Sequence, residues 1–150
     1  MTAQLGGGLF LDQRPHSLLG WRADIRIDRA EHASTLGNIA LLSMSASLSA
    51  LVHLKRGRMA GSAGLGMRWG ALRFSGEGRE GVISQSFWAP LLSVSAFLEV
   101  SIRVLPRLDL TFGLESDVPL KPVEAQADGV PVMAIEGLSV TGTAGIALLF

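Results

Sequence analysis

The sequence contains no cysteine, which excludes disulfide bonds, thiolate catalysis and cysteine-ligated metal sites. Charge is also scarce: only 17% of the residues are charged, whereas about 25% is ordinary for a soluble domain. The 13 basic and 13 acidic residues balance, and they form no block of one sign. The composition therefore does not favour nucleic acid or an acidic polymer as a partner.

Long hydrophobic runs are missing as well, although 48% of the 150 residues are hydrophobic. No stretch reaches the roughly 18 consecutive apolar residues that a membrane helix needs. Residues 1–8 lack the basic and apolar regions of a secretory leader. We expect a single domain over residues 1–150, given either as the mature part of an exported protein or as the C-terminal part of a longer chain.

The apolar residues that are present recur at every second position. In residues 37–54, serines occupy positions 43, 45, 47 and 49, and apolar residues occupy the even positions from 42 to 52. On a helix the four serines would spread over about 300° of the circumference and would form no polar stripe. The pattern predicts a β-strand, with a buried helix as the alternative.

The same alternation continues along most of the chain. It is clear in residues 19–28, 92–104, 108–115 and 139–150, weaker in 58–69 and 72–79, and poor in 4–12. We expect tight turns at residues 55–58 and 105–107, a turn at Gly70, and a long connection over residues 116–137 with room for a small hairpin. These segments predict an all-β fold, an antiparallel up-and-down meander β-barrel of about eight strands.

Alternation alone does not distinguish a soluble sheet from a membrane barrel, because both have one polar and one apolar face. The patterned runs, however, exceed the five or six residues of an average strand and match the roughly 9–11 that cross a membrane. The only two lysines, Lys55 and Lys121, fall in expected turns or loops. The polar faces instead carry small residues mixed with charges. These features favour a barrel of the outer-membrane type.

The charged residues on the expected polar faces balance, with six arginines and six carboxylates. We predict that they form a network of salt bridges in the barrel lumen. A pore selective for ions would show an excess of one sign. The predicted network comprises Arg22, Asp24, Arg26, Asp28, Arg68, Arg73, Glu77, Arg79, Glu99, Arg103, Asp109 and Glu115.

The last residues of the chain end on Phe150, preceded at alternate positions by Leu148 and Ile146. This segment resembles the C-terminal sorting signal of bacterial outer-membrane β-barrel proteins, although Gly142 and Ala144 replace larger residues upstream. The resemblance implies a location in the bacterial outer membrane, with the lipid bilayer and the outer-membrane insertion machinery as partners. It also implies that the chain end is periplasmic and that the connection over residues 116–137 is extracellular.

Residues that carry chemistry do not form a recognisable constellation. His16, His32 and His53 are scattered, and no spacing selects a serine and a carboxylate to accompany one of them. The glycine-rich residues 6–8 and 61–70 lack the ending of a phosphate-binding loop. We therefore expect no enzymatic activity, no cofactor and no metal site.

The sequence leaves three functions open. The first is a small outer-membrane barrel with a structural, surface-binding or adhesive role. The second is a porin-like transport barrel, either whole or as a fragment. The third is a soluble protein, a lipocalin-like or secreted β-sandwich binding protein whose apolar face is its core. The sequence does not indicate an oligomeric state.

Overall fold

A computed structural model describes residues 4–13, 18–34, 37–78, 86–127, 130–135 and 137–149. Within these ranges the protein is all-β, and no helix is long and apolar enough to cross a membrane. The strands are β1 (Gln4–Gln13), β2 (Leu19–Ser34), β3 (Gly37–Arg56), β4 (Met59–Gly78), β5 (Ser86–Leu105), β6 (Leu108–Pro119), β7 (Val123–Ala127), β8 (Val130–Ile135) and β9 (Ser139–Leu148).

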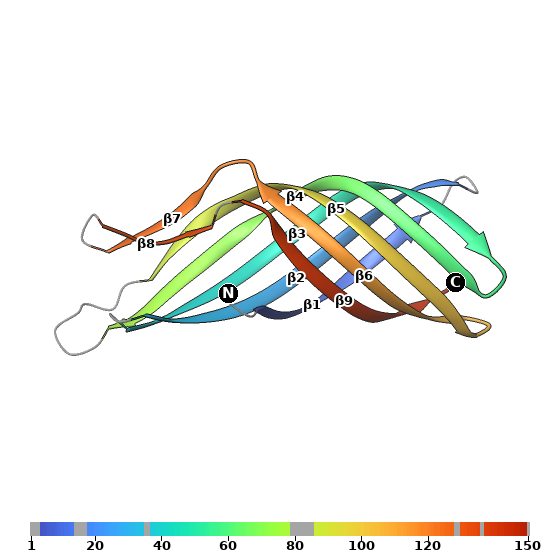
Figure 1. The fold of residues 1–150 in the computed structure, drawn as a ribbon, viewed down its shortest axis with the longest axis horizontal. Coiled ribbons are helices and arrows are strands. Elements are labelled where there is room, and N and C mark those ends of the chain that lie inside the picture. Colours follow the sequence, from blue (N-terminus) through green and yellow to red (C-terminus); the bar gives the residue numbers. More distant parts are fainter. Residues whose placement is uncertain are drawn as a thin grey trace.

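Seven of the strands form one antiparallel meander, in the order β1-β2-β3-β4-β5-β6-β9. This sheet curls into a half-barrel, and β7 and β8 form a separate hairpin at one end of it (Figure 1). We call this the hairpin end. The opposite end, where β3 turns into β4 and β5 turns into β6, is the turn end. The expected antiparallel meander and the hairpin within residues 116–137 are both confirmed.

The turns at the turn end lie where the sequence places them. Arg56 pairs with Met59, so that two residues connect β3 to β4, and Gly57 takes a positive φ of 63° there. Glycine adopts such a conformation without a steric penalty. Leu105 pairs with Leu108 across an equally short turn containing Pro106. These short turns hold the strands in antiparallel register.

The expected turn at Gly70 is wrong. Strand β4 runs without interruption from Met59 to Gly78, and Gly70 pairs with Ser45 on one side and Leu91 on the other. A ladder on both sides of the strand satisfies its backbone better than a turn would. Because side chains alternate along one continuous strand, the residues of β4 that follow Gly70 lie on the face opposite to their predicted place.

The two faces of the curled sheet differ in polarity. The interior, or concave, face carries most of the buried residues, and polar side chains dominate it, including the serine row of β3. Large apolar residues such as Leu65, Leu98 and Leu114 are about 60% exposed on the convex face (66%, 63% and 59%). An apolar cluster of Leu41, Leu72 and Phe74 is buried inside the hairpin end. The core is therefore mostly polar.

Glycines on the concave face of β4 let that strand approach β3 closely. A Cβ atom added at Gly70 would overlap the carbonyl oxygen of Met44 and would lie 2.8 Å from the Cα of Ser45. A Cβ atom at Gly142, on the convex face of β9, would meet nothing within 4 Å. The missing side chain thus permits tight curvature of the sheet between β3 and β4.

We therefore expect Gly70→Ala to lower the free energy of unfolding by about 1–3 kcal/mol, as overpacking does. Gly142→Ala, the matched control in another strand, should change it little. Urea unfolding of both variants measures the difference. Equal losses from the two substitutions would mean that the close approach at Gly70 has no special importance.

Candidate functional site

The candidate site is the polar network inside the curled sheet. Its floor is the row of Ser43, Ser45, Ser47 and Ser49 on β3, all buried, because strict period two directs every second side chain to the concave face. Ser93 and Ser95 continue the polar surface on β5, with 1% and 2% of their surface exposed. Small side chains at these positions leave the interior to the longer charged residues.

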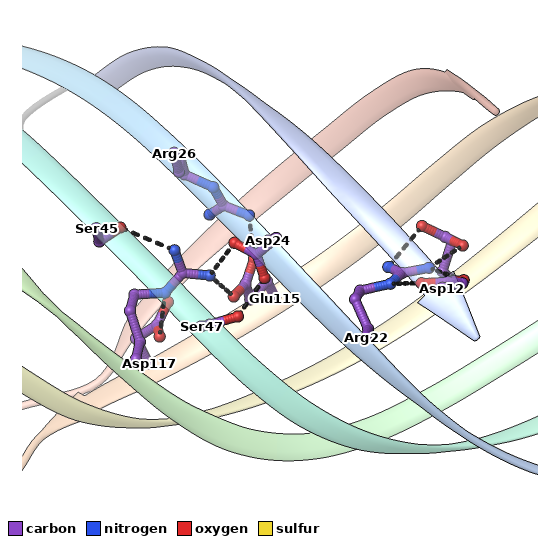
Figure 2. A network of polar contacts seen from close by, with 10 residues as sticks. Asp12, Arg22, Asp24, Arg26, Ser45, Ser47, Glu115 and Asp117 are labelled. Atoms are coloured by element: carbon purple, nitrogen blue, oxygen red, sulfur yellow. Dashed lines mark hydrogen bonds and ion pairs between the residues drawn. The ribbon is translucent and has the colours of Figure 1, made fainter. Parts of the chain in front are cut away.

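Arg68 of β4 is the centre of the first group of charges, which we call the Arg68 cluster. Figure 2 labels the surrounding residues of this cluster, among them Asp24, Glu115 and Asp117. Its side chain is only 4% exposed. The guanidinium group donates to Asp117 at 3.2 Å and to the Ser45 hydroxyl at 3.0 Å. It also forms ion pairs with Glu115 and, at 3.4 Å, with Asp24. One arginine therefore connects β4 to β2, β3 and β6.

Glu115 extends the Arg68 cluster across the interior. Its carboxylate accepts hydrogen bonds from both Arg68 and Arg26, and Arg26 lies on β2. The Ser47 hydroxyl donates to Asp24 in the same cluster. Strands β2 and β6 are not neighbours in the sheet, so their side chains can meet only on the concave side. The contact shows that the sheet curls far enough for distant strands to face each other.

A second group, the Arg22 cluster, lies nearer the turn end. Arg22 of β2 donates to both carboxylate oxygens of Asp12, at 2.6 and 2.9 Å, and to both of Glu99, at 2.9 and 2.8 Å. The rings of Phe10 and Phe97 lie on the guanidinium group, each 4.5 Å from its central carbon. Forked hydrogen bonds and cation–π contact are the two interactions that suit arginine best. The cluster joins β1, β2 and β5.

Two smaller polar contacts also lie in the interior of the described sheet. Arg103 and Asp109 form a pair at 2.9 Å at the turn end, where the arginine side chain is 32% exposed. His53 Nδ1 lies 3.0 Å from the Ser62 hydroxyl, and both residues are buried. Among the described residues, no group of three or more His, Asp or Glu side chains is arranged to hold a metal ion. The interior is thus a network of arginine–carboxylate ion pairs and hydrogen bonds to hydroxyl groups.

Nine of the twelve residues of the predicted network lie on the concave face and are buried or half-buried. They are Arg22, Asp24, Arg26, Asp28, Arg68, Glu99, Arg103, Asp109 and Glu115.

The prediction is wrong for one of the other three members, and the side chains of the other two lie outside the described residues. Arg73 is exposed on the convex face, 5.9 Å from the ring of Trp88, because β4 continues through Gly70. Glu77 lies an even number of residues after Arg73 on β4, so its backbone position faces the same side of the sheet as that of Arg73. The side chain of Glu77 lies outside the described residues. Arg79 also lies outside them. At the C-terminal segment, Ile146 and Leu148 are 63% and 61% exposed on the convex face, and Phe150 lies outside the described residues.

Four residues of the concave face lie outside the predicted network: Asp12, Asp117, Phe10 and Phe97. Asp12 lies on β1, whose alternation in the sequence is poor. Asp117 lies on β6, beyond residue 115, where the sequence pattern placed the end of that strand. Phe97 is an apolar residue among the polar positions of residues 92–104, and its contact with Arg22 accounts for that place. The sequence signal for this contact was an aromatic residue at one of the alternate positions that polar and charged residues otherwise occupy.

These additions change the charge balance of the interior. Among the described charged residues that lie on the concave face and are not exposed, carboxylates outnumber arginines by seven to four. The arginines are Arg22, Arg26, Arg68 and Arg103; the carboxylates are Asp12, Asp24, Asp28, Glu99, Asp109, Glu115 and Asp117. The predicted equality of six and six does not hold for this part of the chain, which has an acidic excess.

Comparisons with known proteins add no family to this description. No protein-family model, no curated protein and no solved structure matches the chain.

Removing the Arg68 guanidinium group should leave Glu115, Asp117 and Asp24 as buried carboxylates without their common partner. We expect Arg68→Met to lower the free energy of unfolding by about 3–5 kcal/mol, the usual cost of breaking a buried ion pair. Arg29→Met is the control, because the Arg29–Glu31 pair is 68% exposed on both sides and should contribute about 0–1 kcal/mol. Urea unfolding followed by tryptophan fluorescence measures both. Similar losses would contradict a buried network.

Proposed function

We propose that the protein is a small outer-membrane β-barrel with a structural, surface-binding or adhesive role and a salt-bridged lumen. The observation that carries the proposal is the polarity of the two faces. The buried residues of the described ranges are mainly polar or charged, whereas large apolar side chains cover the outside of the sheet. A protein in water arranges its faces the other way round, and a barrel in lipid requires this arrangement.

The apolar outer face is continuous around the strands. It includes Ile25 of β2, Leu48 of β3, Leu65 of β4, Leu98 of β5 and Leu114 of β6, which are between 52% and 66% exposed. An exposed apolar surface of this extent needs a covering in water. Strands β3, β4 and β5 have 20 residues each, more than the roughly 9–11 that cross a tilted membrane span. A lipid bilayer is the covering that suits a face of this shape.

The interior supports a closed lumen in preference to a transport path. The Arg22 and Arg68 clusters cross between strands that are not neighbours, and their side chains are held by several charged hydrogen bonds each. At the hairpin end, Leu72 and Phe74 are 2% exposed, and the ring of Phe74 stacks on that of Phe87 at 4.9 Å. A lipocalin-like or sandwich protein would have apolar residues where these ionic clusters lie.

The proposed location is the bacterial outer membrane, with the bilayer and the insertion machinery as partners. Ile146 and Leu148 support this because both project from the convex face of the last strand, where a sorting signal would be accessible. In this orientation the turn end is periplasmic. The β7–β8 hairpin extends from the other end (Figure 1), which suits a surface-binding role outside the cell.

The membrane assignment predicts that the chain associates with lipid and forms a heat-modifiable barrel. The purified protein should float with liposomes, and its unheated form should migrate differently from its boiled form on a denaturing gel. A protein that stays in solution as a monomer without detergent would contradict the assignment.

A charge on the lipid face should be costly in a manner that depends on depth. Leu98 lies well inside β5 and is 63% exposed, whereas Val104 lies on the same face at the turn end and is 54% exposed. We expect Leu98→Arg to lower the free energy of unfolding in liposomes by about 2–4 kcal/mol, and Val104→Arg by about 0–1 kcal/mol. Urea titration in liposomes measures both. Equal tolerance of arginine at the two positions would argue against a membrane span.

A closed lumen should conduct poorly. We expect planar bilayers that contain the protein to show no steady open channels, because charged side chains cross the interior and pair with one another. Steady channels of uniform size would favour the transport function over the structural one.

A further inference from the structure

The two edges of the sheet leave a seam between β1 and β9. Within the described residues, β1 pairs only with β2 and β9 only with β6. A cavity of about 310 Å³ lies at this seam, lined on one side by residues of β1 such as Gly6 and Gly8 and on the other by Thr141 and Thr143 of β9. Its lining also includes Arg26 and other residues of the interior. The seam thus connects the apolar outside with the charged inside.

The directions of the two edge strands limit how the seam closes. Each neighbouring pair from β1 through β6 to β9 is antiparallel, so the first and the last of the seven strands run the same way. Both lead from the hairpin end to the turn end, where the C-terminus lies in Figure 1. They cannot form an antiparallel pair with each other. One strand running in the opposite direction would pair antiparallel with both.

The side chains along the seam specify the character of that strand. On the outside, Leu9 of β1 is 74% exposed and Ile146 of β9 is 63% exposed. On the inside, both edges carry small residues, and a Cβ atom at Gly6 would overlap the Asp28 carboxylate. A strand in the seam therefore needs large apolar residues on its outward face. These must alternate with inward residues that are small or polar enough for the interior.

Charge adds a second requirement. The cavity is lined by Arg22 and Arg26, and also by Asp24, Asp28, Glu99 and Glu115. Arg22 already contacts Asp12 and Glu99, and Arg26 contacts Glu115. The concave face as described has more carboxylates than arginines. A basic side chain that enters from the seam beside Asp28 would reduce this acidic excess.

We propose that the seam is filled by one more strand of the same polypeptide, which belongs to a segment upstream of Met1, runs antiparallel to both β1 and β9, and directs a basic side chain toward Asp28. The inference rests on the proposed function, because in lipid an unpaired sheet edge is not tolerated. A strand with this direction ends at the hairpin end, where β1 begins, so a short turn connects the two. A second copy paired through β1 is disfavoured, since antiparallel pairing would invert it in the membrane.

The chain is tested with a designed strand attached to Gln4 through an Asn-Gly turn. The strand has ten residues, alternates valine outward with threonine inward, and carries one lysine on the inward face opposite Gly6. One control replaces that lysine with glutamate, and a second has the same composition in an order without alternation. In liposomes, the temperature at which the heat-modifiable band disappears should rise most with lysine, less with glutamate, and not at all with the shuffled strand. Equal temperatures for all three would overturn the proposal.

Cross-linking tests the other ways to close the seam. The chain has no cysteine, and Gly7 and Ala144 both line the cavity from opposite edges. A disulfide needs Cα atoms about 4.4–6.8 Å apart, whereas a strand in the seam sets the edges roughly 9–10 Å apart. In the lysine-extended protein, the Gly7→Cys/Ala144→Cys variant should form no disulfide. A rapid intramolecular disulfide means direct closure, and a disulfide-linked dimer means a second copy; either result overturns the proposal.

Liposome flotation of the unextended chain separates this inference from the proposed function. A chain that floats but gains no heat stability from the lysine strand contradicts the seam proposal alone. A chain that does not float contradicts the membrane assignment itself.

Discussion

The pairing of buried arginines with carboxylates is the interaction on which the rest of this structure depends. Charged groups inside a protein are costly unless they are paired and hydrogen-bonded. Here, several partners come from strands that are not neighbours in the sheet, as with Arg26 and Glu115 or Arg22 and Glu99. Each of these pairs needs a curled sheet, and the curled sheet in turn needs polar residues on its inner face. The ionic contacts and the curvature support each other.

Small residues make this arrangement possible. The interior has limited width, and small residues beside the arginines leave room for them, as Ser47 and Ser93 do on either side of Arg68. Gly66 and Gly70 bring β4 close to β3 on the same face. The serine row and the glycines thus have one physical role: they leave volume for the charged groups and let neighbouring strands bend tightly.

The alternation of residue types predicted the meander, its tight turns and the inward place of nine charged residues. It could do so because successive side chains of any strand point to opposite faces of the sheet, whatever the rest of the fold. It failed at Gly70, since a glycine that permits a turn is indistinguishable in sequence from one that permits close packing of two strands. Arg73 was misplaced for that reason alone. Asp117 and Phe97 were missed because their roles depend on Arg68 and Arg22, which lie on other strands. The seam between β1 and β9 arises because the sheet has an odd number of strands, and no single segment of the sequence shows that number.

The contact between Arg22 and Glu99 joins residues 77 positions apart in the chain. Such a long loop must close before the ion pair forms, and long-range closures of this kind make folding slow. Until β5 and β6 arrive, Arg22 lacks Glu99 and Arg26 lacks Glu115, and these charged groups would face hydrocarbon if β2 entered the bilayer alone. Assembly is therefore expected to be concerted: the hairpins gather first, and the charged inner face is enclosed as the whole sheet enters the membrane.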